Sequence, residues 1–285
     1  MNKYSSLTPE VLHILKDKGT EVPFSCSYDT DATQGTYLCR GCGHALFRAD
    51  SHFTSGCGWP SFDDEISDAV KRVSDKDARR TEIVCNTCDG HLGHVFCGEQ
   101  FTAKNTRHCV NSLAIEFVGN NTVLETEEAI LAAGCFWGVE YFLQKLPGVL
   151  KTEVGYIGGT VEHPTYEQVC TKKTGHLEAL RVIFDPTVLT YKALLKYFFE
   201  IHDTAQEDGQ GPDLGPQYLS AIFYFDQQQK QTAEQVISQL IELDYPVATK
   251  LYQMSSFWPA ETYHQDYYTK TGKPPYCHLW TKKFT

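Results

Sequence analysis

The stretch Gly134-Cys135-Phe136-Trp137-Gly138 follows a short apolar run at 129–133 and opens an apolar segment at 139–146, which Pro147-Gly148 ends. This order predicts a strand that turns directly into a helix, with Cys135 at the helix N-terminus. Unpaired backbone N–H groups and the positive end of the helix dipole favour thiolate over thiol there, and only the thiolate is a competent nucleophile. The alternative is a buried structural cysteine, which the apolar neighbours also permit.

Beyond Cys135, strand and helix patterns alternate along the chain. The patterns predict strands at 149–156, 180–184, 221–225 and 247–254, and helices at 190–201 and 226–243. Asp226 is suited to cap the last helix, because its side chain can accept from a free N–H of the first turn. We therefore predict a two-layer α/β domain over residues 126–285.

Residues 1–118 show a different pattern, in which short strand-like runs are separated by Gly, Asp, Ser and Asn turns. The runs lie at 36–38, 45–47, 70–73, 81–84 and 113–117. They follow a short amphipathic helix that begins after Thr8, with Pro9 in its first turn. We predict an all-β N-terminal domain, joined to the α/β domain by a short polar linker at 119–125.

Two Cys-x-x-Cys pairs lie within the predicted β domain, Cys39 with Cys42 and Cys85 with Cys88. Each pair can point two thiolates at one ion, and two such knuckles complete the tetrahedral four-sulfur shell that zinc prefers. Four protein ligands leave no open position, so the pattern predicts structural Zn²⁺ rather than a catalytic metal, and no organic cofactor. The alternative is four unrelated thiols.

Composition narrows the possible partners and compartments. The chain of 285 residues has 25 Lys and Arg against 36 Asp and Glu, a net charge of −11, which disfavours a nucleic-acid partner. No apolar run approaches the roughly 20 residues that span a bilayer, and the first residues are polar. We expect a soluble cytoplasmic protein without a membrane partner. Its cysteines, 11 in all, are then more plausible as metal ligands and catalytic thiols than as structural disulfides.

The segment around Cys135 resembles the peptide methionine sulfoxide reductases of the A type. The resemblance also rests on the stretches 156–159, 164–170, 175–178, 202–203, 213–220 and 260–265. It implies that Cys135 attacks the sulfoxide sulfur and that Cys277 resolves the resulting sulfenic acid. Further implied roles are a methyl pocket from Phe136 and Trp137, a proton from Glu178, and contacts to the oxygen from Tyr166, Asp213 and Tyr218.

Glu178 has a chemical reason to be part of this set. Sulfoxide oxygen is a poor leaving group until it is protonated, and a glutamic acid kept neutral near pH 7 by an apolar, aromatic-lined pocket can supply the proton. Considered alone, Glu178 would more often be a surface carboxylate.

Three blocks of the N-terminal domain resemble the methionine sulfoxide reductases of the B type, namely 55–62, 91–96 and 107–112, together with the two Cys-x-x-Cys pairs. The resemblance implies that Cys109 is the nucleophile and Cys57 the resolving cysteine. It further implies substrate contacts from Trp59, His91, His94 and Asn111. Arg107 is expected to lower the pKa of Cys109 through its charge, which follows from proximity alone.

Both resemblances together predict a bifunctional methionine sulfoxide reductase, recycled by an external dithiol such as thioredoxin. Each reductase accepts one epimer of the chiral sulfur, so the α/β domain is expected to act on the S form and the β domain on the R form. Two alternatives are a zinc protein whose other cysteines sense oxidants, and a general disulfide oxidoreductase. Cys170 matches a cysteine of the A-type family and is expected to be structural. No role is predicted for Cys26 or Cys97.

Overall fold

The computed structural model of the protein describes residues 7–25, 34–74, 80–119, 123 and 125–284. The chain divides into two compact units, Asn2–Thr126 and Glu127–Thr285. Each unit has a hydrophobic core of its own. The predicted linker, residues 119–125, lies mostly outside the described residues, and the limits predicted for the two domains stay predictions.

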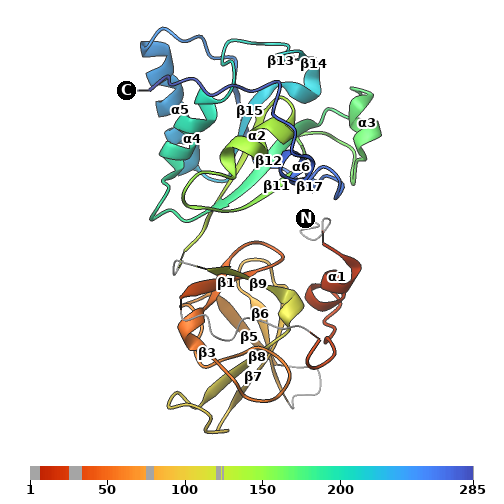
Figure 1. Ribbon diagram of the computed structural model, residues 1–285, viewed down its shortest axis with the longest axis vertical. Coiled ribbons are helices and arrows are strands. Elements are labelled where there is room, and N and C mark those ends of the chain that lie inside the picture. The colour runs from red at the N-terminus through yellow and green to blue at the C-terminus, as the bar shows by residue number, and fades with distance from the viewer. Residues whose placement is uncertain (1–6, 26–33, 75–79, 120–122, 124, 285) are drawn as a thin grey trace. The chain divides into compact units, whose positions relative to one another are not determined.

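The N-terminal unit contains two antiparallel sheets. In the smaller sheet, β1 (Gly35–Cys39) lies between β2 (Ala45–Arg48) and β9 (Ile115–Gly119). The larger sheet has the order β3 (His52–Phe53), β4 (Ser61–Phe62), β8 (Thr106–Val110), β7 (His91–Cys97), β6 (Thr81–Cys85) and β5 (Val70–Ser74) (Figure 1). Among the described residues this unit is β-rich, as the turn-separated runs predict.

Local sequence explains where the short helices of this unit begin. Thr8 caps α1 (Pro9–Leu15) by accepting a hydrogen bond from the Val11 N–H at 3.5 Å. A further turn of 3-10 helix, η1, covers Ala49–Ser51.

The strand predicted at 113–117 is wrong at its start, because Ser112–Ala114 form the 3-10 turn η2 and β9 begins at Ile115. The carboxylate of Glu21 binds the N–H groups of Ser112 and Leu113, so these groups do not enter a strand ladder.

The register of the larger sheet aligns polar side chains from four strands. Cys109 on β8 is paired with Ser61 on β4 and with His94 on β7, and His94 is paired with Glu82 on β6. Side chains directly opposite one another in antiparallel strands share a face. Gly93 allows the close approach of β7 to β8, since a Cβ at this position would lie 2.0 Å from the Cys109 carbonyl oxygen.

The C-terminal unit is built on one six-stranded sheet. Its order is β16 (Lys250–Gln253), β15 (Ser220–Tyr224), β10 (Glu127–Ala133), β12 (Leu177–Phe184), β11 (Val149–Ile157) and β17 (Trp258–Pro259). Only β15 and β16 pair in parallel among the described strands. A separate hairpin joins β13 (Gly209–Gln210) to β14 (Asp213–Leu214), and the 3-10 turn η3 (Pro216–Tyr218) follows it.

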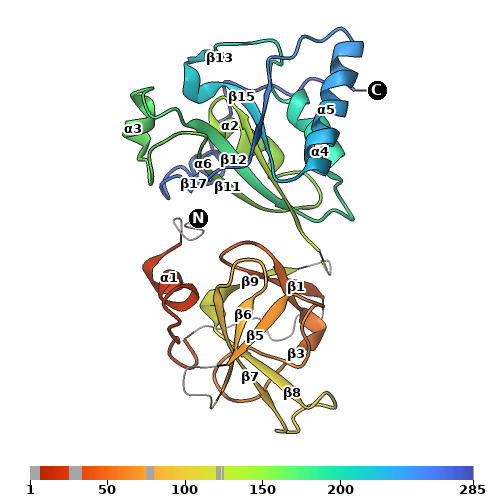
Figure 2. The same ribbon diagram turned by 180° about the vertical axis from the view of Figure 1, so that it is seen from behind.

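Helices cover one face of this sheet, as Figures 1 and 2 show from opposite sides. They are α2 (Phe136–Leu143), α4 (Tyr191–Glu200) and α5 (Gln227–Glu242), which begin close to the predicted starts. The short helices α3 (Tyr166–Cys170) and α6 (Tyr267–Thr271) complete the unit. Within the described residues, no helix is both long and apolar enough to cross a membrane.

The central strand β10 is buried on both faces, which explains its continuous apolar sequence. Ala129, Leu131 and Ala133 belong to the core shared with the helices, whereas Ile130 and Ala132 belong to a smaller core on the opposite face. Because β10 leads directly into α2, the buried sheet fixes the position of the turn that carries Cys135.

Candidate active sites and metal centre

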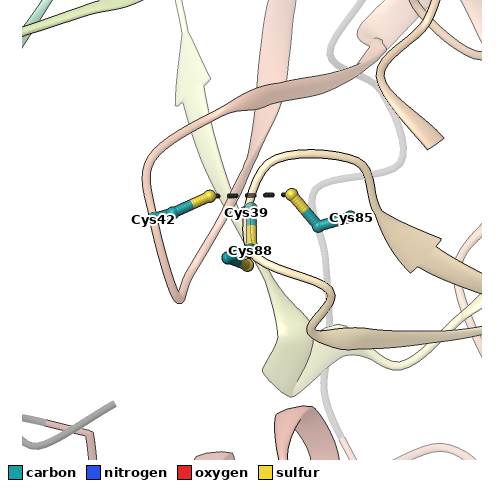
Figure 3. A group of neighbouring side chains, drawn as sticks. All are labelled: Cys39, Cys42, Cys85 and Cys88. Atoms are coloured by element: carbon teal, nitrogen blue, oxygen red, sulfur yellow. Dashed lines mark hydrogen bonds between the residues drawn. The ribbon is translucent and has the colours of Figure 1, made fainter. Parts of the chain in front are cut away.

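The four cysteines of the two Cys-x-x-Cys pairs converge on one point (Figure 3). Cys39 ends β1 and Cys85 ends β6, and the following turns have the same hydrogen bonds. In the first turn the Gly43 N–H donates to Cys39 O and the Cys39 N–H to His44 O, at 2.7 and 2.8 Å. The second turn repeats both bonds at Cys85, with Asp89 N–H as donor and Gly90 O as acceptor, each at 2.9 Å. Both turns therefore present their thiols in the same way.

The sulfur positions fit a tetrahedral metal ion. Cys39 Sγ lies 3.6 Å from Cys88 Sγ, and Cys42 Sγ lies 3.6 Å from Cys85 Sγ. All four sulfurs are within 4.8 Å of one another. A zinc ion with Zn–S bonds of about 2.3 Å in a regular tetrahedron requires sulfurs about 3.8 Å apart. The donor set and its spacing therefore suit Zn²⁺, held between two sheets of the N-terminal unit.

A second thiol pair lies in the same unit. Cys57 Sγ is 3.8 Å from Cys109 Sγ, although the two residues are far apart in sequence. The pairing of β4 with β8 brings them together, because Ser61 lies opposite Cys109 and the loop before Ser61 carries Cys57. Ser55 Oγ, at 3.0 Å, also contacts the Cys57 sulfur. Cys57 and Cys109 are thus close enough to form a disulfide after a small movement.

Arg107 lies beside this pair and is itself held by a carboxylate. Its guanidinium donates to both oxygens of Glu99, at 2.7 and 3.0 Å, and to Cys57 Sγ at 3.5 Å. The pKa of Cys109 is raised to about 12, first by burial and then by the neighbouring Cys57, while Arg107 acts in the opposite direction. The effect of Arg107 has the predicted sign, but burial has the larger effect on the pKa of Cys109.

The predicted polar residues lie on strand β7 and at the end of strand β8. His94 lies directly opposite Cys109. The His91 ring lies 5.6 Å from the His94 ring, and its Nδ1 is 2.8 Å from Glu82 Oε1. Asn111 follows β8 and donates to Leu92 O at 3.1 Å. This bond fixes the Asn111 amide against the strand that carries both histidines.

Glu21 is a residue of this site that the sequence analysis missed. Its carboxylate accepts hydrogen bonds from Ser112 Oγ and from the N–H groups of Ser112 and Leu113. Its backbone N–H donates to Asn111 Oδ1 at 3.1 Å, and its carbonyl accepts from Trp59 Nε1 at 3.2 Å. Glu21 therefore connects Trp59 to Asn111, both of which are predicted to contact the substrate. No motif spacing reveals it, because its partners lie about 40 and 90 positions away.

We expect Glu21→Gln to destabilise the N-terminal unit by about 1.5–3 kcal/mol, since a charged acceptor with several buried donors is replaced by a neutral amide. The loss of alignment at Trp59 and Asn111 is also expected to weaken turnover at the Cys109 site. Urea unfolding of the purified full chain measures the first effect. Glu125→Gln, which changes an exposed carboxylate of the same unit, is the control and should leave the unfolding midpoint unchanged.

In the C-terminal unit, Cys135 is the N-cap residue of α2, as the sequence predicts. Gly134 precedes it with φ +86°, a conformation that favours glycine, and a Cβ there would lie 2.4 Å from the Gln210 side chain. A carboxylate and a second thiol lie close to the Cys135 sulfur. Atoms of Cys135, Asp213 and Cys277 are all within 4.8 Å of one another. Residues from three distant parts of the chain therefore meet at the start of α2.

Glu178 lies on β12 and faces the same helix N-terminus. Its carboxyl group accepts a hydrogen bond from the Phe136 N–H at 3.1 Å, and the residue is only 2% exposed. The pKa of Glu178 is raised to about 8, first by burial and also by Asp213 and Cys277, while the Phe136 N–H acts in the opposite direction. The side chain is therefore neutral at pH 7, as predicted, and can donate a proton.

The structure contradicts the expectation that the helix terminus makes Cys135 a ready thiolate. The pKa of Cys135 is raised well above its ordinary value by the Cys277 thiol, by burial and by Glu178, while a backbone N–H lowers it. Cys135 is 6% exposed. The helix terminus acts in the predicted direction, but the buried neighbours outweigh it.

Aromatic residues form the wall beside Cys135. Trp137 stacks on Tyr267 with ring centroids 3.7 Å apart, and its indole N–H donates to His264 Nδ1 at 3.1 Å. Phe136 is fully buried against Tyr156. Burial and then the charge of Glu178 raise the pKa values of Tyr166 and Tyr218, so both phenols keep their protons at neutral pH.

Glu261 and His264, which had no predicted role, hold the aromatic residues of this wall in place. Glu261 accepts from the Tyr156 hydroxyl and from the Tyr166 N–H, each at 2.9 Å, so it fixes the start of α3. His264 fixes Trp137 through the bond given above. Both lie in the stretch 260–265, which the sequence analysis singled out without assigning a function to either side chain.

Cys277 belongs to a segment without helix or strand, 272–284, and is nevertheless buried at 6% exposure. Its thiol already lies within 4.8 Å of the Cys135 sulfur, so no rearrangement of this segment is needed to bring the two together. Cys97, which has no predicted role, is exposed, and Cys26 lies outside the described residues. Cys170 is also exposed, although a structural cysteine is expected there.

Each unit thus contains two neighbouring thiols, with aromatic side chains and proton donors beside them. This arrangement is typical of a thiol-dependent oxidoreductase. Two family models match the chain. Residues 127–285 match the model for "Peptide methionine sulfoxide reductase", and residues 7–119 match the "SelR domain". The chain belongs to the peptide methionine sulfoxide reductase family, with a SelR domain fused N-terminal to the A-type domain. It is an enzyme that combines both types of methionine sulfoxide reductase activity.

Relatives and a solved structure agree for the C-terminal unit. A peptide methionine sulfoxide reductase MsrA of Thermus thermophilus is 54% identical over 154 residues, which cover 54% of this chain and 88% of that protein. An MsrA of Methanosarcina mazei is 49% identical over 149 residues, covering 51% and 71%. The crystal structure of reduced Mxr1 from Saccharomyces cerevisiae matches with a TM-score of 0.52 at 30% identity, covering 54% of this chain and 92% of that one.

Proposed function

We propose that residues 126–285 reduce the S epimer of methionine sulfoxide and residues 1–118 the R epimer, in free methionine or in oxidised proteins. The observation that carries the proposal is the presence of two separate thiol pairs, Cys57 with Cys109 and Cys135 with Cys277, one in each unit. Each pair stands beside its own aromatic residues and proton donors. Together the two sites would repair both products of methionine oxidation.

At the C-terminal site, the Cys135 sulfur attacks the sulfoxide sulfur while Glu178 protonates the oxygen. The oxygen is transferred to Cys135, so methionine sulfur is reduced and leaves as the thioether, and Cys135 is oxidised to sulfenic acid. Phe136 and Trp137 form the wall for the terminal methyl group, and Tyr166, Asp213 and Tyr218 hold the oxygen. Neutral Glu178 is suited to this step because its pKa lies above 7.

At the N-terminal site, Cys109 is the nucleophile and Cys57 is the resolving cysteine. Trp59 packs on the methyl group, while His91, His94 and Asn111 orient and protonate the oxygen. Arg107 supports the negative charge on sulfur, because its guanidinium already contacts Cys57 and lowers the pKa of Cys109. The cross-strand position of His94 beside Cys109 supports its role as a proton donor.

Zn²⁺ bound by Cys39, Cys42, Cys85 and Cys88 would crosslink the N-terminal unit. Four thiolates complete its coordination and leave no position for substrate, so the ion stabilises the fold and takes no part in the reaction. The matching hydrogen bonds of the two cysteine turns support this assignment.

An external dithiol such as thioredoxin would reopen the disulfide that closes at each site. A depression of about 490 Å³ borders Cys277 and is lined by Pro212, Tyr276 and Leu279, among others. Tyr276 and Leu279 are 58% and 79% exposed, which gives a reductant apolar surface beside the disulfide. A cytoplasmic location would supply such a reductant.

The proposal is tested by incubating the full chain with racemic methionine sulfoxide and a thiol reductant, and separating the remaining epimers on a chiral column. Both epimers should disappear. If one epimer persists at its initial concentration while the protein is folded and reduced, the function proposed for one domain is wrong.

We expect reduction of the S epimer to slow as the pH rises through about 8, because Glu178 then loses the proton that it must donate. Glu178→Gln should lower the S-epimer rate by roughly 10²–10⁴-fold and abolish this alkaline decline. Reduction of the R epimer by the same variant is the internal control and should keep its wild-type rate. An unchanged S-epimer rate would show that another group protonates the oxygen.

A further inference from the structure

His278 follows Cys277 directly and contacts its sulfur. The imidazole Nδ1 lies 3.1 Å from Cys277 Sγ, and Nε2 lies 2.6 Å from the carbonyl oxygen of Ala133. The side chain is almost fully buried, with 1% of the residue exposed. A base within hydrogen-bond reach of a thiol, itself oriented by a third group, is the arrangement that activates nucleophiles in many enzymes.

The bond to Ala133 determines which nitrogen carries the proton. A carbonyl oxygen can only accept a hydrogen bond, so Nε2 must be the protonated nitrogen. In the neutral ring, Nδ1 then has a lone pair directed at the Cys277 sulfur. A thiol can donate its proton to that lone pair, and the resulting thiolate accepts a hydrogen bond from Nδ1 of the imidazolium.

The packing around the ring fixes it to the turn that carries Cys135. Ala133 is the last residue of β10, two positions before Cys135. Gly138, in the first turns of α2, leaves the space that the imidazole occupies, since a Cβ at Gly138 would lie 2.1 Å from His278 Nδ1. Position 138 must therefore be glycine, because any larger residue would collide with the imidazole.

We propose that His278 is the general base that ionises Cys277 for attack on the sulfenic acid of Cys135. The inference rests on the proposed function, in which Cys277 is the resolving residue. Nδ1 removes the thiol proton, and the thiolate attacks the Cys135 sulfur. The S–S bond forms as the S–O bond breaks, and the proton passes to the leaving hydroxide to give water. Cys277 is oxidised and the Cys135 sulfenic acid is reduced, so no further reactant is needed.

Cys135 and His278 both favour the Cys277 thiolate, but only His278 does so in the same way before and after Cys135 is oxidised. In the reduced protein the pKa of Cys277 is lowered to about 6, first by the hydrogen bond with Cys135 and also by His278, against the effect of burial. Once Cys135 carries the sulfenic oxygen, its S–H is no longer available as a donor. His278 is unaffected by that change and remains in contact with the sulfur that must attack.

Several charged or titratable groups surround this pair. Asp213 and Cys135 contribute atoms within 4.8 Å of the Cys277 sulfur, and the charge of Asp213 raises the pKa of Cys277. His202, after α4, is close enough to His278 for their charges to interact. The Asp213 carboxylate opposes ionisation of the Cys277 thiol, so it does not replace the base.

The test is a single turnover of the reduced full chain with the S epimer and no recycling reductant. Methionine release and loss of free thiols are followed separately by rapid quenching with an alkylating agent. In His278→Gln the new amide can still donate to Ala133 O, but no base faces Cys277. We expect wild-type methionine release, disulfide closure at least roughly 10²-fold slower, and a sulfenic acid that a dimedone probe traps.

Alkaline pH separates a chemical role from a structural one. Disulfide closure in His278→Gln should speed up as the pH is raised, because the Cys277 thiol then ionises without a base. His163→Gln, at an exposed histidine of the same unit, should behave as wild type. If His278→Gln does not fold, Gly138→Ala keeps the imidazole but displaces it, and is expected to slow closure in the same way.

Wild-type closure in folded His278→Gln would overturn the inference and leave the proposed function intact. So would an equal slowing of methionine release and closure that alkaline pH does not relieve, because a structural role has that signature. If the wild-type chain itself releases methionine without a disulfide between Cys135 and Cys277, the role proposed for Cys277 fails, and the inference fails with it.

Discussion

Cys135→Ser is expected to abolish reduction of the S epimer, with a fall of more than roughly 10⁴-fold, while reduction of the R epimer continues at the wild-type rate. A serine hydroxyl is much less acidic than a thiol, attacks sulfur poorly, and cannot form the sulfenic acid or the disulfide that completes the cycle. Chiral separation of the sulfoxide left after incubation with racemic substrate measures both rates in one experiment.

Cys109→Ser should give the opposite result, with loss of the R-epimer rate and an unchanged S-epimer rate. The matched control is Cys97→Ser, since Cys97 is exposed and lies on the neighbouring strand β7. The control should reduce both epimers. If Cys135→Ser and Cys109→Ser lost the same epimer, or if neither lost one, the assignment of one epimer to each domain would be wrong.

Cys85→Ser is expected to remove the metal ion and unfold the N-terminal unit, while the C-terminal unit remains folded. Structural zinc sites contribute about 10–16 kcal/mol in zinc-finger peptides, which equals or exceeds the whole stability of a typical domain, about 5–15 kcal/mol. Elemental analysis should find one zinc per wild-type chain and none in the variant. The R-epimer activity should be lost and the S-epimer activity kept.

Calorimetry of the same variant follows folding independently of activity. The wild-type chain should show transitions from both units, and Cys85→Ser should lose the one that chelators shift in the wild-type protein. Cys97→Ser, which removes a thiol outside the cluster, should retain both the zinc and the transition. A Cys85→Ser chain that still holds one zinc and has full R-epimer activity would contradict the structural metal site.

The sequence identifies features that depend on neighbours along the chain. The turn at Cys135, the caps at Thr8 and Asp226, and the two cysteine knuckles are all determined within a few residues, and the structure contains each of them. The neutral state of Glu178 is also anticipated, because chemistry requires a proton donor and the aromatic surroundings disfavour charge.

Features that depend on distant partners are harder to predict. The raised pKa values of Cys109 and Cys135 arise from burial and from thiols brought close by the fold, so the local effects of Arg107 and the helix terminus do not decide them. Glu21 shifts the start of β9 through hydrogen bonds to a segment about 90 residues away. His278 acquires its place through Ala133, which lies 145 positions away in sequence.

The most direct test of two independent thiol pairs is to map disulfides after one turnover without a recycling reductant. Racemic substrate should lower the mass of the fully reduced chain by about 4 Da, since each disulfide removes two hydrogens. Peptide mapping should find Cys57 joined to Cys109 and Cys135 joined to Cys277, and the S epimer alone should close only the second pair. A single disulfide with racemic substrate, or both disulfides with one pure epimer, would contradict the account.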